Sequence, residues 1–351
     1  MKQGFCPFDY KRILQGWRFM DDQVVLRVSN LRVGFATEDH GMLVAVDGLS
    51  FDLRAGETLG LVGESGCGKS VTALSLLRLL PQPLGKILSG EILIKTKDGW
   101  EDIVRLPANQ LSRIRGARIS MIFQEPMTAL NPVHTIGRQI FESFRLHFPE
   151  MSDKDILMKS LELLEDVGIP SPEKRIHEFP HQLSGGMRQR VVIAIALSAD
   201  PDILVADEPT TALDVTIQAQ ILDLMLALQK KRGMSILLIT HDLGVVAQMC
   251  QRTLVMYAGR LAEARDTRSL FKDPRHPYTK GLLHSIPRLG SVRKTLLPTI
   301  EGSVPALKDL LRGCRFQSRC PLVTERCREE IPEVQIKQDQ NLACWNRGFH
   351  D

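Results

Sequence analysis

Short apolar segments alternate along the chain with segments of helical periodicity. Four short segments are predicted to be buried strands: Thr58–Gly63, Arg118–Phe123, Asp202–Asp207 and Ser235–Thr240. A helix is predicted between an N-cap at Ser152 or Asp153 and a stop at Gly168. Its apolar positions have helical spacing: Ile156, Leu157, Leu161, Leu164 and Val167. Strands alternating with helices predict an α/β fold with a mostly parallel sheet.

The pattern changes near residues 273–277, where the sequence reads DPRHP. Beyond this point proline and arginine become frequent and the apolar periodicity fades. We therefore expect an N-terminal extension at 1–23, a main domain at 24–272 and a small C-terminal domain at 273–351. Met20 precedes the first predicted strand, so residues before it are either an extension without a role in the fold or a misassigned start.

Composition limits the class of protein. The 351 residues are 43% hydrophobic and 25% charged, and a net charge of +4 is spread without blocks, which does not indicate nucleic-acid binding. The longest apolar run, Val191–Leu197, is far shorter than the roughly 20 residues of a membrane span. The first residues lack the apolar core of a signal peptide, so we expect a cytoplasmic protein, where disulfides are rare.

The segment GESGCGKS fits the phosphate-binding P-loop pattern, and it lies between a predicted strand and a helix-like segment. Its glycines let backbone N–H groups surround phosphates, Lys69 supplies charge at the β- and γ-phosphates, and the Ser70 hydroxyl can ligate Mg²⁺. A chance glycine-rich turn is the alternative, which the flanking strand and helix disfavour. The candidate nucleotide-binding residues are Gly63, Glu64, Ser65, Gly66, Cys67, Gly68, Lys69, Ser70 and Val71.

Two further motifs carry polar groups suited to a nucleotide. In DILVADE a predicted strand delivers Asp207, a candidate Mg²⁺ ligand, and then Glu208, which could orient and polarise an attacking water. The alternative is a solvated strand end. In LSGGMRQR, Ser184, Gly185 and Gly186 form a turn at a helix start, where exposed N–H groups suit an anion. The alternative there is an ordinary N-cap.

Together these motifs make the chain resemble the ATP-binding subunit of an ABC transporter, from about Val24 to Leu283. In that family the signature turn of one subunit meets the γ-phosphate of ATP held by the P-loop of another, so two subunits enclose two nucleotides. The resemblance implies a P-loop ATPase domain at 24–272, with a helical subdomain at about 125–195.

Four more residues match motifs of this family. Gln124 in IFQEP corresponds to the loop glutamine that links Mg²⁺ to the membrane subunits, and His241 to the histidine that contacts the γ-phosphate. Asp214 corresponds to the acid that crosses the dimer interface. Phe35 corresponds to the aromatic residue that stacks on adenine, although the turn after it is lengthened and Phe35 could instead belong to the core.

Longer segments, among them Gln124–Ile140 and His276–Pro287, resemble the oligopeptide/dipeptide importer branch. There two related ATPase subunits form a heterodimer beneath two membrane permease subunits, and a separate binding protein captures peptide. The resemblance implies an ATPase for peptide import at the cytoplasmic face of the inner membrane, with Met127–Ile140 in the groove that receives the permeases. Import of nickel, glutathione or another small solute is the alternative. A soluble ABC ATPase of repair or translation fits less well, since those usually carry two ATPase halves or long coiled coils.

Four of the seven cysteines lie near the C-terminus: Cys314, Cys320, Cys327 and Cys344. Disulfides are disfavoured by the compartment, and clustering in a weakly apolar tail disfavours unlinked thiols. Structural zinc takes four thiolates but usually uses paired C-x₂₋₄-C hairpins, which this segment lacks, whereas a 4Fe–4S cluster tolerates varied spacing. The branch resemblance implies such a cluster, with a structural role that fixes the tail near the partner subunit. Cys6, Cys67 and Cys250 are not assigned to it.

Overall fold

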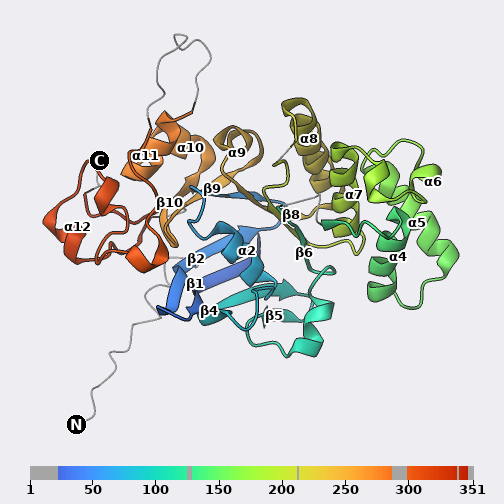
Figure 1. The fold of residues 1–351 in the computed structure, drawn as a ribbon, viewed down its shortest axis with the longest axis horizontal. Helices are drawn as coiled ribbons and strands as arrows, with labels where there is room; N and C mark the ends of the chain where they lie inside the picture. Colours follow the sequence, from blue (N-terminus) through green and yellow to red (C-terminus); the bar gives the residue numbers. More distant parts are fainter. Residues whose placement is uncertain (1–22, 125–128, 212, 287–298, 338–339, 347–351) are drawn as a thin grey trace.

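The computed structural model describes residues 23–124, 129–211, 213–286, 299–337 and 340–346. The predicted N-terminal extension, with Met20 and Cys6, lies outside the described residues except for Gln23. Two sheets occupy the middle of the molecule, a helical lobe lies at one end, and the C-terminal segment lies at the other (Figure 1). No helix among the described residues is long and apolar enough to cross a membrane.

An eight-stranded sheet forms the centre, in the order β11-β12-β10-β9-β3-β8-β7-β6. Its neighbours from β9 to β6 are parallel: β9 (Arg252–Tyr257), β3 (Thr58–Val62), β8 (Ser235–Thr240), β7 (Ile203–Asp207) and β6 (Ile119–Ile122). Every residue of the last four is buried, as expected for parallel strands covered on both faces. All four predicted strands are confirmed to within a residue or two at each end.

A second, antiparallel sheet was not predicted. Its order is β2 (Gly41–Arg54), β1 (Val24–Thr37), β4 (Gly85–Thr96) and β5 (Gly99–Asp102). The period-two signal is present at the start of β1, where Val24, Leu26 and Val28 are buried and the residues between them are partly exposed. Register shifts follow between Val28 and Arg32, so the alternation does not persist along the strand.

The helical lobe contains α4 (Ile136–His147), α5 (Asp153–Asp166), α6 (Pro172–Arg175) and α7 (Gly185–Leu197). The prediction for α5 is confirmed, because Ser152 caps its first turn by accepting from the Asp155 N–H, and Gly168 follows its end with φ 73°. Leu157 is an exception to the predicted apolar face, since it is 37% exposed. Four other α-helices of the described chain lie outside this lobe and outside the C-terminal segment: α2 (Lys69–Leu76), α8 (Val215–Arg232), α9 (Leu243–Met249) and α10 (Thr267–Lys272).

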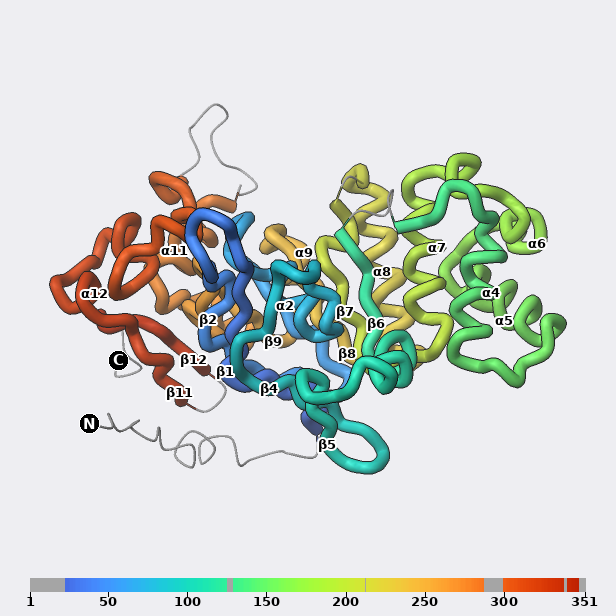
Figure 2. Tube along the Cα trace, turned by 60° about the horizontal axis from the view of Figure 1, so that its bottom comes forward, coloured from blue at the N-terminus to red at the C-terminus, as the bar shows by residue number. Residues whose placement is uncertain are grey.

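The C-terminal segment adds to the main sheet. It contains α11 (Pro277–His284), α12 (Glu325–Glu329), β11 (Gln335–Lys337) and β12 (Gln340–Leu342). Strand β12 pairs antiparallel with β10 (Arg260–Asp266) and so belongs to the eight-stranded sheet. Cys344 lies two residues after the end of β12. Both views place α11 and α12 at the end opposite the helical lobe (Figures 1 and 2).

His276 is the N-cap of α11, and its burial should make the free energy of unfolding depend on pH. Its Nδ1 accepts from the Tyr278 N–H, its ring also bonds to the Ala343 backbone, and burial lowers the pKa of the imidazole to about 4. The pKa of His276 is lower in the folded than in the unfolded chain. Its contribution to the free energy of unfolding is therefore full above pH 6.5, and the free energy falls by about 3 kcal/mol as the pH drops toward 4. His276→Asn keeps a cap acceptor that cannot titrate. Chemical unfolding at a series of pH values should show a flatter profile for the variant, and identical slopes would contradict this assignment.

Candidate active site

The P-loop connects β3 to α2, and its shape requires glycine at two of its positions. Gly63 has φ 153°, and a Cβ there would collide with the carbonyl oxygen of Met256. Gly68 has φ 101°, and a Cβ would lie 2.9 Å from the Ala45 carbonyl oxygen. Gly68 is also the N-cap of α2 and supplies no capping side chain. The helix N-terminus can therefore receive an anion.

Lys69 is the first residue of α2, and its side chain turns back toward the loop and is buried, so that the residue is only 6% exposed. Its Nζ donates to the carbonyl oxygens of Gly63, at 2.7 Å, and Glu64, at 3.1 Å. Ser65 and Gly66, at the tip of the loop, are exposed. The lysine thus ties the loop together and places its positive charge at the loop, which is the element that surrounds phosphates in P-loop proteins.

Asp207 ends β7 beside the P-loop and is 3% exposed. Burial raises the pKa of its carboxyl, against a hydrogen bond from Ser70, and its Oδ1 has no hydrogen-bond partner. A buried carboxylate oxygen without a partner is costly, and a serine hydroxyl beside it supplies a second oxygen. Mg²⁺ takes one or two protein oxygens and otherwise water and phosphate, so Ser70 and Asp207 fit this ion.

The other predicted catalytic residues, Gln124 and His241, both contact the carboxylate of Glu208. Its carboxylate accepts from Gln124 Nε2 at 3.2 Å and from Thr211 Oγ1 at 2.9 Å, and lies 3.1 Å from His241 Nδ1. Burial would raise the pKa of this carboxyl, but the bonds with His241 and Thr211 hold it below its usual value. Glu208 is therefore an ionised carboxylate that can accept a proton from water. Thr211 was not predicted, although its position three residues after Glu208 could have suggested the contact.

The signature turn and the P-loop of the chain lie apart. Ser184 caps α7 by accepting from the Met187 N–H at 3.3 Å, and Asp214 caps α8 by accepting from the Ile217 N–H at 2.9 Å. At Gly186 a Cβ would lie 2.8 Å from Ile217, and Gly185 precedes it in the first turn. Helix α7 belongs to the helical lobe, away from α2 in both views (Figures 1 and 2). The chain thus has two separate helix N-termini, at the P-loop and at Ser184, that were predicted to receive an anion.

Three candidates remain: Phe35 in β1, and Cys67 and Val71 beside Lys69 and Ser70. Phe35 is partly exposed, packs against the core of the antiparallel sheet and pairs across strands with Gly85, and its role in stacking on adenine stays a prediction. Val71 packs against the same core. Cys67 is fully buried, and burial raises the pKa of its thiol, so it is an unreactive part of the loop.

Sequence profiles of two families match the chain: the ABC transporter family over residues 46–211, and the oligopeptide/dipeptide transporter C-terminal region over residues 262–327. The dipeptide transport ATP-binding protein DppD of Bacillus subtilis is 52% identical over 92% of this chain and 94% of its own length. The chain belongs to the ATP-binding proteins of ABC transporters. The probable peptide ABC transporter ATP-binding protein y4tR of Sinorhizobium fredii is 49% identical over 92% of this chain and 95% of its own.

The fold of this ABC transporter ATPase is shared with solved structures. The ATP-binding cassette MJ0796, a dimer in a post-hydrolysis state with ADP and Pi, matches with a TM-score of 0.60 and 26% identity, over 69% of this chain and 99% of that one. CbiO1 of Clostridium perfringens, part of the complex cbiONQ, matches with a TM-score of 0.60 and 26% identity over 72% and 92%. The family resemblance and the P-loop ATPase fold predicted from the sequence are confirmed.

The four C-terminal cysteines of this ABC protein lie in one neighbourhood. Burial raises the pKa of Cys314 to about 11, and the other three thiols add to this shift. Gly313 has φ 83°, which lets the Cys314 N–H donate to the Cys327 carbonyl oxygen at 2.7 Å. Cys344 is buried beyond β12. Among the described residues, no three His, Cys, Asp or Glu side chains are arranged to hold a single metal ion.

Proposed function

We propose that this chain is the ATP-hydrolysing subunit that powers import of di- and oligopeptides, bound peripherally at the cytoplasmic face of the inner membrane. The main support is sequence identity to proteins named for peptide and dipeptide transport. About half of the aligned residues are identical, and the alignments cover more than nine-tenths of both chains. The match to the oligopeptide/dipeptide C-terminal region at residues 262–327 supports the same substrate class.

In this proposal Lys69 and the P-loop hold the phosphates of ATP, and Ser70 and Asp207 hold Mg²⁺. The ion would neutralise charge on the β- and γ-phosphates. Glu208 receives the proton of the attacking water, and its lowered pKa keeps it ionised at neutral pH. His241 would contact the γ-phosphate and Gln124 would be a further Mg²⁺ ligand, and both would orient the Glu208 carboxylate. Their hydrogen bonds to Glu208 support the orienting role.

The partners in this proposal are a second, related ATPase subunit, two membrane permease subunits and, indirectly, a solute-binding protein. Segment Met127–Ile140 would contact the permeases, although Met127 and Thr128 lie outside the described residues. The separation of the Ser184 turn from the P-loop supports a pair in which each chain completes the site of the other.

Ser184→Arg tests this pairing. It places a bulky cation at the turn that meets the partner's nucleotide, so ATP turnover by the purified pair should fall at least about tenfold. Binding at the chain's own P-loop should be unchanged, because Lys69 and Ser70 are distant from the substitution. Turnover and binding of a fluorescent ATP analogue would be measured side by side. Full activity of an isolated monomer at every protein concentration would contradict the pairing.

We also propose that Cys314, Cys320, Cys327 and Cys344 hold a 4Fe–4S cluster. Two observations support this: the other three thiols lie close enough to raise the pKa of Cys314, and four cysteines at varied spacing suit a cubane, whereas structural zinc usually uses paired C-x₂₋₄-C hairpins. The cluster would cross-link a segment whose own helices and strands are short.

Cys320→Ser tests the cluster. Anaerobically purified wild-type protein should be brown and contain iron and acid-labile sulfide, and Cys320→Ser should lose all three properties, because a ligand is removed. Cys250→Ser is the matched control, since Cys250 is buried in the main core and should leave the iron content unchanged. Colourless anaerobic protein with stoichiometric zinc, or with no metal, would contradict the proposal.

Transport itself is tested by uptake in a strain that lacks the gene. Cells carrying the wild-type gene should take up radiolabelled di- and tripeptides, while cells carrying Glu208→Gln should not. Nickel and glutathione, offered to the same cells, distinguish the alternative solutes. Restored uptake of either of these without restored peptide uptake would replace the proposed substrate class and leave the ATPase in place.

A further inference from the structure

The C-terminal segment contacts the P-loop directly. Arg319, the residue before Cys320, forms a bidentate ion pair with Glu64: Nη1 lies 2.7 Å from Oε2 and Nη2 lies 3.0 Å from Oε1. Glu64 is the second residue of GESGCGKS, and Arg319 lies 255 positions away in sequence. The arginine side chain is only 4% exposed, so solvent screens this pair weakly.

The guanidinium is fixed on its other sides by the C-terminal segment itself. Its Nε donates to the Glu301 carbonyl oxygen at 2.8 Å, and Nη2 also donates to Ile300, at 3.1 Å, and Gly302, at 3.3 Å. Nη1 contacts the Tyr257 hydroxyl at 3.4 Å. The hydrogen bond to Glu64 raises the pKa of Arg319. A planar fork held in this way fixes the position of the carboxylate it binds.

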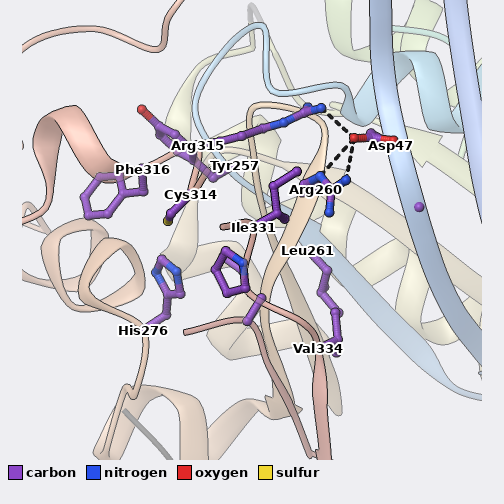
Figure 3. A pocket seen from close by; sticks show the side chains of 14 residues that line it. Asp47, Tyr257, Arg260, Leu261, His276, Cys314, Arg315, Phe316, Ile331 and Val334 are labelled. Carbon is purple, nitrogen blue, oxygen red and sulfur yellow. Dashed lines mark hydrogen bonds and ion pairs between the residues drawn. The ribbon is translucent and has the colours of Figure 1, made fainter. Parts of the chain in front are cut away.

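A second contact holds the backbone of the same residue. The Glu64 N–H donates to the Tyr278 hydroxyl at 2.9 Å. Tyr278 is fully buried, and its ring packs edge-on against Tyr257, at 4.7 Å between centroids, and in a tilted arrangement against Phe316, at 5.4 Å. Figure 3 shows Tyr257 and Phe316 beside Cys314 and Arg315. Glu64 is thus held at side chain and main chain by residues that belong to or pack against the C-terminal segment.

We propose that Arg319 is a positioning residue for ATP binding: through Glu64, the C-terminal segment holds the P-loop in its phosphate-binding shape. The carbonyl oxygens of Gly63 and Glu64 are the acceptors of Lys69 Nζ, so fixing Glu64 also fixes the lysine. A loop that is ordered before binding loses less entropy when ATP arrives. The cysteine segment then acts on the ATP site through the residue that precedes Cys320. This inference rests on ATP binding by the chain and on neither the solute nor the metal.

Arg319→Gln, compared with Arg315→Gln, tests the proposal in the purified full-length chain. Arg315 also docks the C-terminal segment, since its Nη2 lies 2.7 Å from Asp47 Oδ2 (Figure 3) and Nη1 donates to the Ala258 carbonyl. Neither Asp47 nor Ala258 belongs to the P-loop. We expect Arg319→Gln to weaken binding of a fluorescent ATP analogue roughly tenfold, the loss typical of one charged hydrogen-bond pair. Arg315→Gln should change ATP affinity less than about twofold while lowering the melting temperature comparably.

A double-mutant cycle separates positioning from general weakening of the fold. Glu64→Gln should weaken ATP binding to a similar extent. The double variant with Arg319→Gln should bind ATP as well as the single variant of lower affinity, because both changes break the same ion pair. In steady-state assays of the assembled transporter, KM for ATP should rise and kcat should change little. Tyr278→Phe, which removes only the acceptor of the Glu64 N–H, provides a milder variant and should also raise KM.

Three results would overturn the proposal. One is wild-type ATP affinity in Arg319→Gln. Another is equal loss of affinity in Arg315→Gln, which would make the effect one of docking in general. The third is an additive cycle, which would mean that Arg319 acts by a route other than Glu64. If Arg319→Gln does not fold, Arg319→Lys replaces it, because lysine keeps the charge but lacks the planar fork. It should lower ATP affinity in the same way, but by less.

Discussion

Glu208→Gln is expected to bind ATP as the wild-type chain does and to hydrolyse it at least about 100-fold more slowly, the usual cost of losing a general base. The amide cannot take the proton of the attacking water, although it can still accept from Thr211 and Gln124. Steady-state phosphate release and equilibrium binding, measured on the same preparation, give the two quantities. Because ATP persists, the pair of subunits should also remain closed, which size-exclusion chromatography with ATP would detect.

Thr211→Val serves as the matched control for this variant. It removes one hydrogen bond to the Glu208 carboxylate without removing the base, so it should slow hydrolysis far less than Glu208→Gln does. Turnover near the wild-type rate in Glu208→Gln would contradict the role given to Glu208.

Lys69→Ala should affect the earlier step. The loop would lose both its positive charge and its two internal hydrogen bonds, so ATP affinity should fall by about 10- to 100-fold, from charged hydrogen bonds worth 1.5–3 kcal/mol each. Titration with a fluorescent ATP analogue measures this loss. Lys272→Ala, an exposed lysine at the end of α10, controls for loss of charge elsewhere and should bind normally. Unchanged affinity in Lys69→Ala would move the phosphate site away from this loop.

The sequence was informative where one local pattern decides the structure. Strands β3, β6, β7 and β8 are short, mostly apolar runs, because both faces of a parallel sheet are covered, and such runs are visible without alignment. The ends of β3 and β7 carry the P-loop and Asp207, so placing these strands also placed those groups. Glu208, Gln124 and His241 were predicted from separate motifs, and the structure brings all three together.

The antiparallel sheet escaped prediction because its alternation is broken. Within β1, Asn30 adopts φ 48° and the register shifts on both sides of Leu31, so the buried face changes along the strand. Gly48, with φ 77°, interrupts β2 opposite this point. An apolar pattern of period two cannot be recognised across such irregularities.

The contact between Arg319 and Glu64 could not be predicted for a different reason. Nothing in the local sequence of either residue marks it as a partner of the other, and the pairing arises only when the C-terminal segment packs against the main sheet through β12 and β10. Glu64 was named as a residue of the P-loop, but the residue that fixes it was not. Long-range ion pairs of this kind depend on tertiary packing alone.

The most direct measurement of the central claim is ATP hydrolysis by the complete transporter in lipid nanodiscs, with and without peptide-loaded binding protein. We predict that di- or oligopeptide accelerates hydrolysis, and that Glu208→Gln in this chain removes the acceleration. Hydrolysis that no peptide accelerates, while nickel or glutathione does, would contradict the claim that this ATPase powers peptide import.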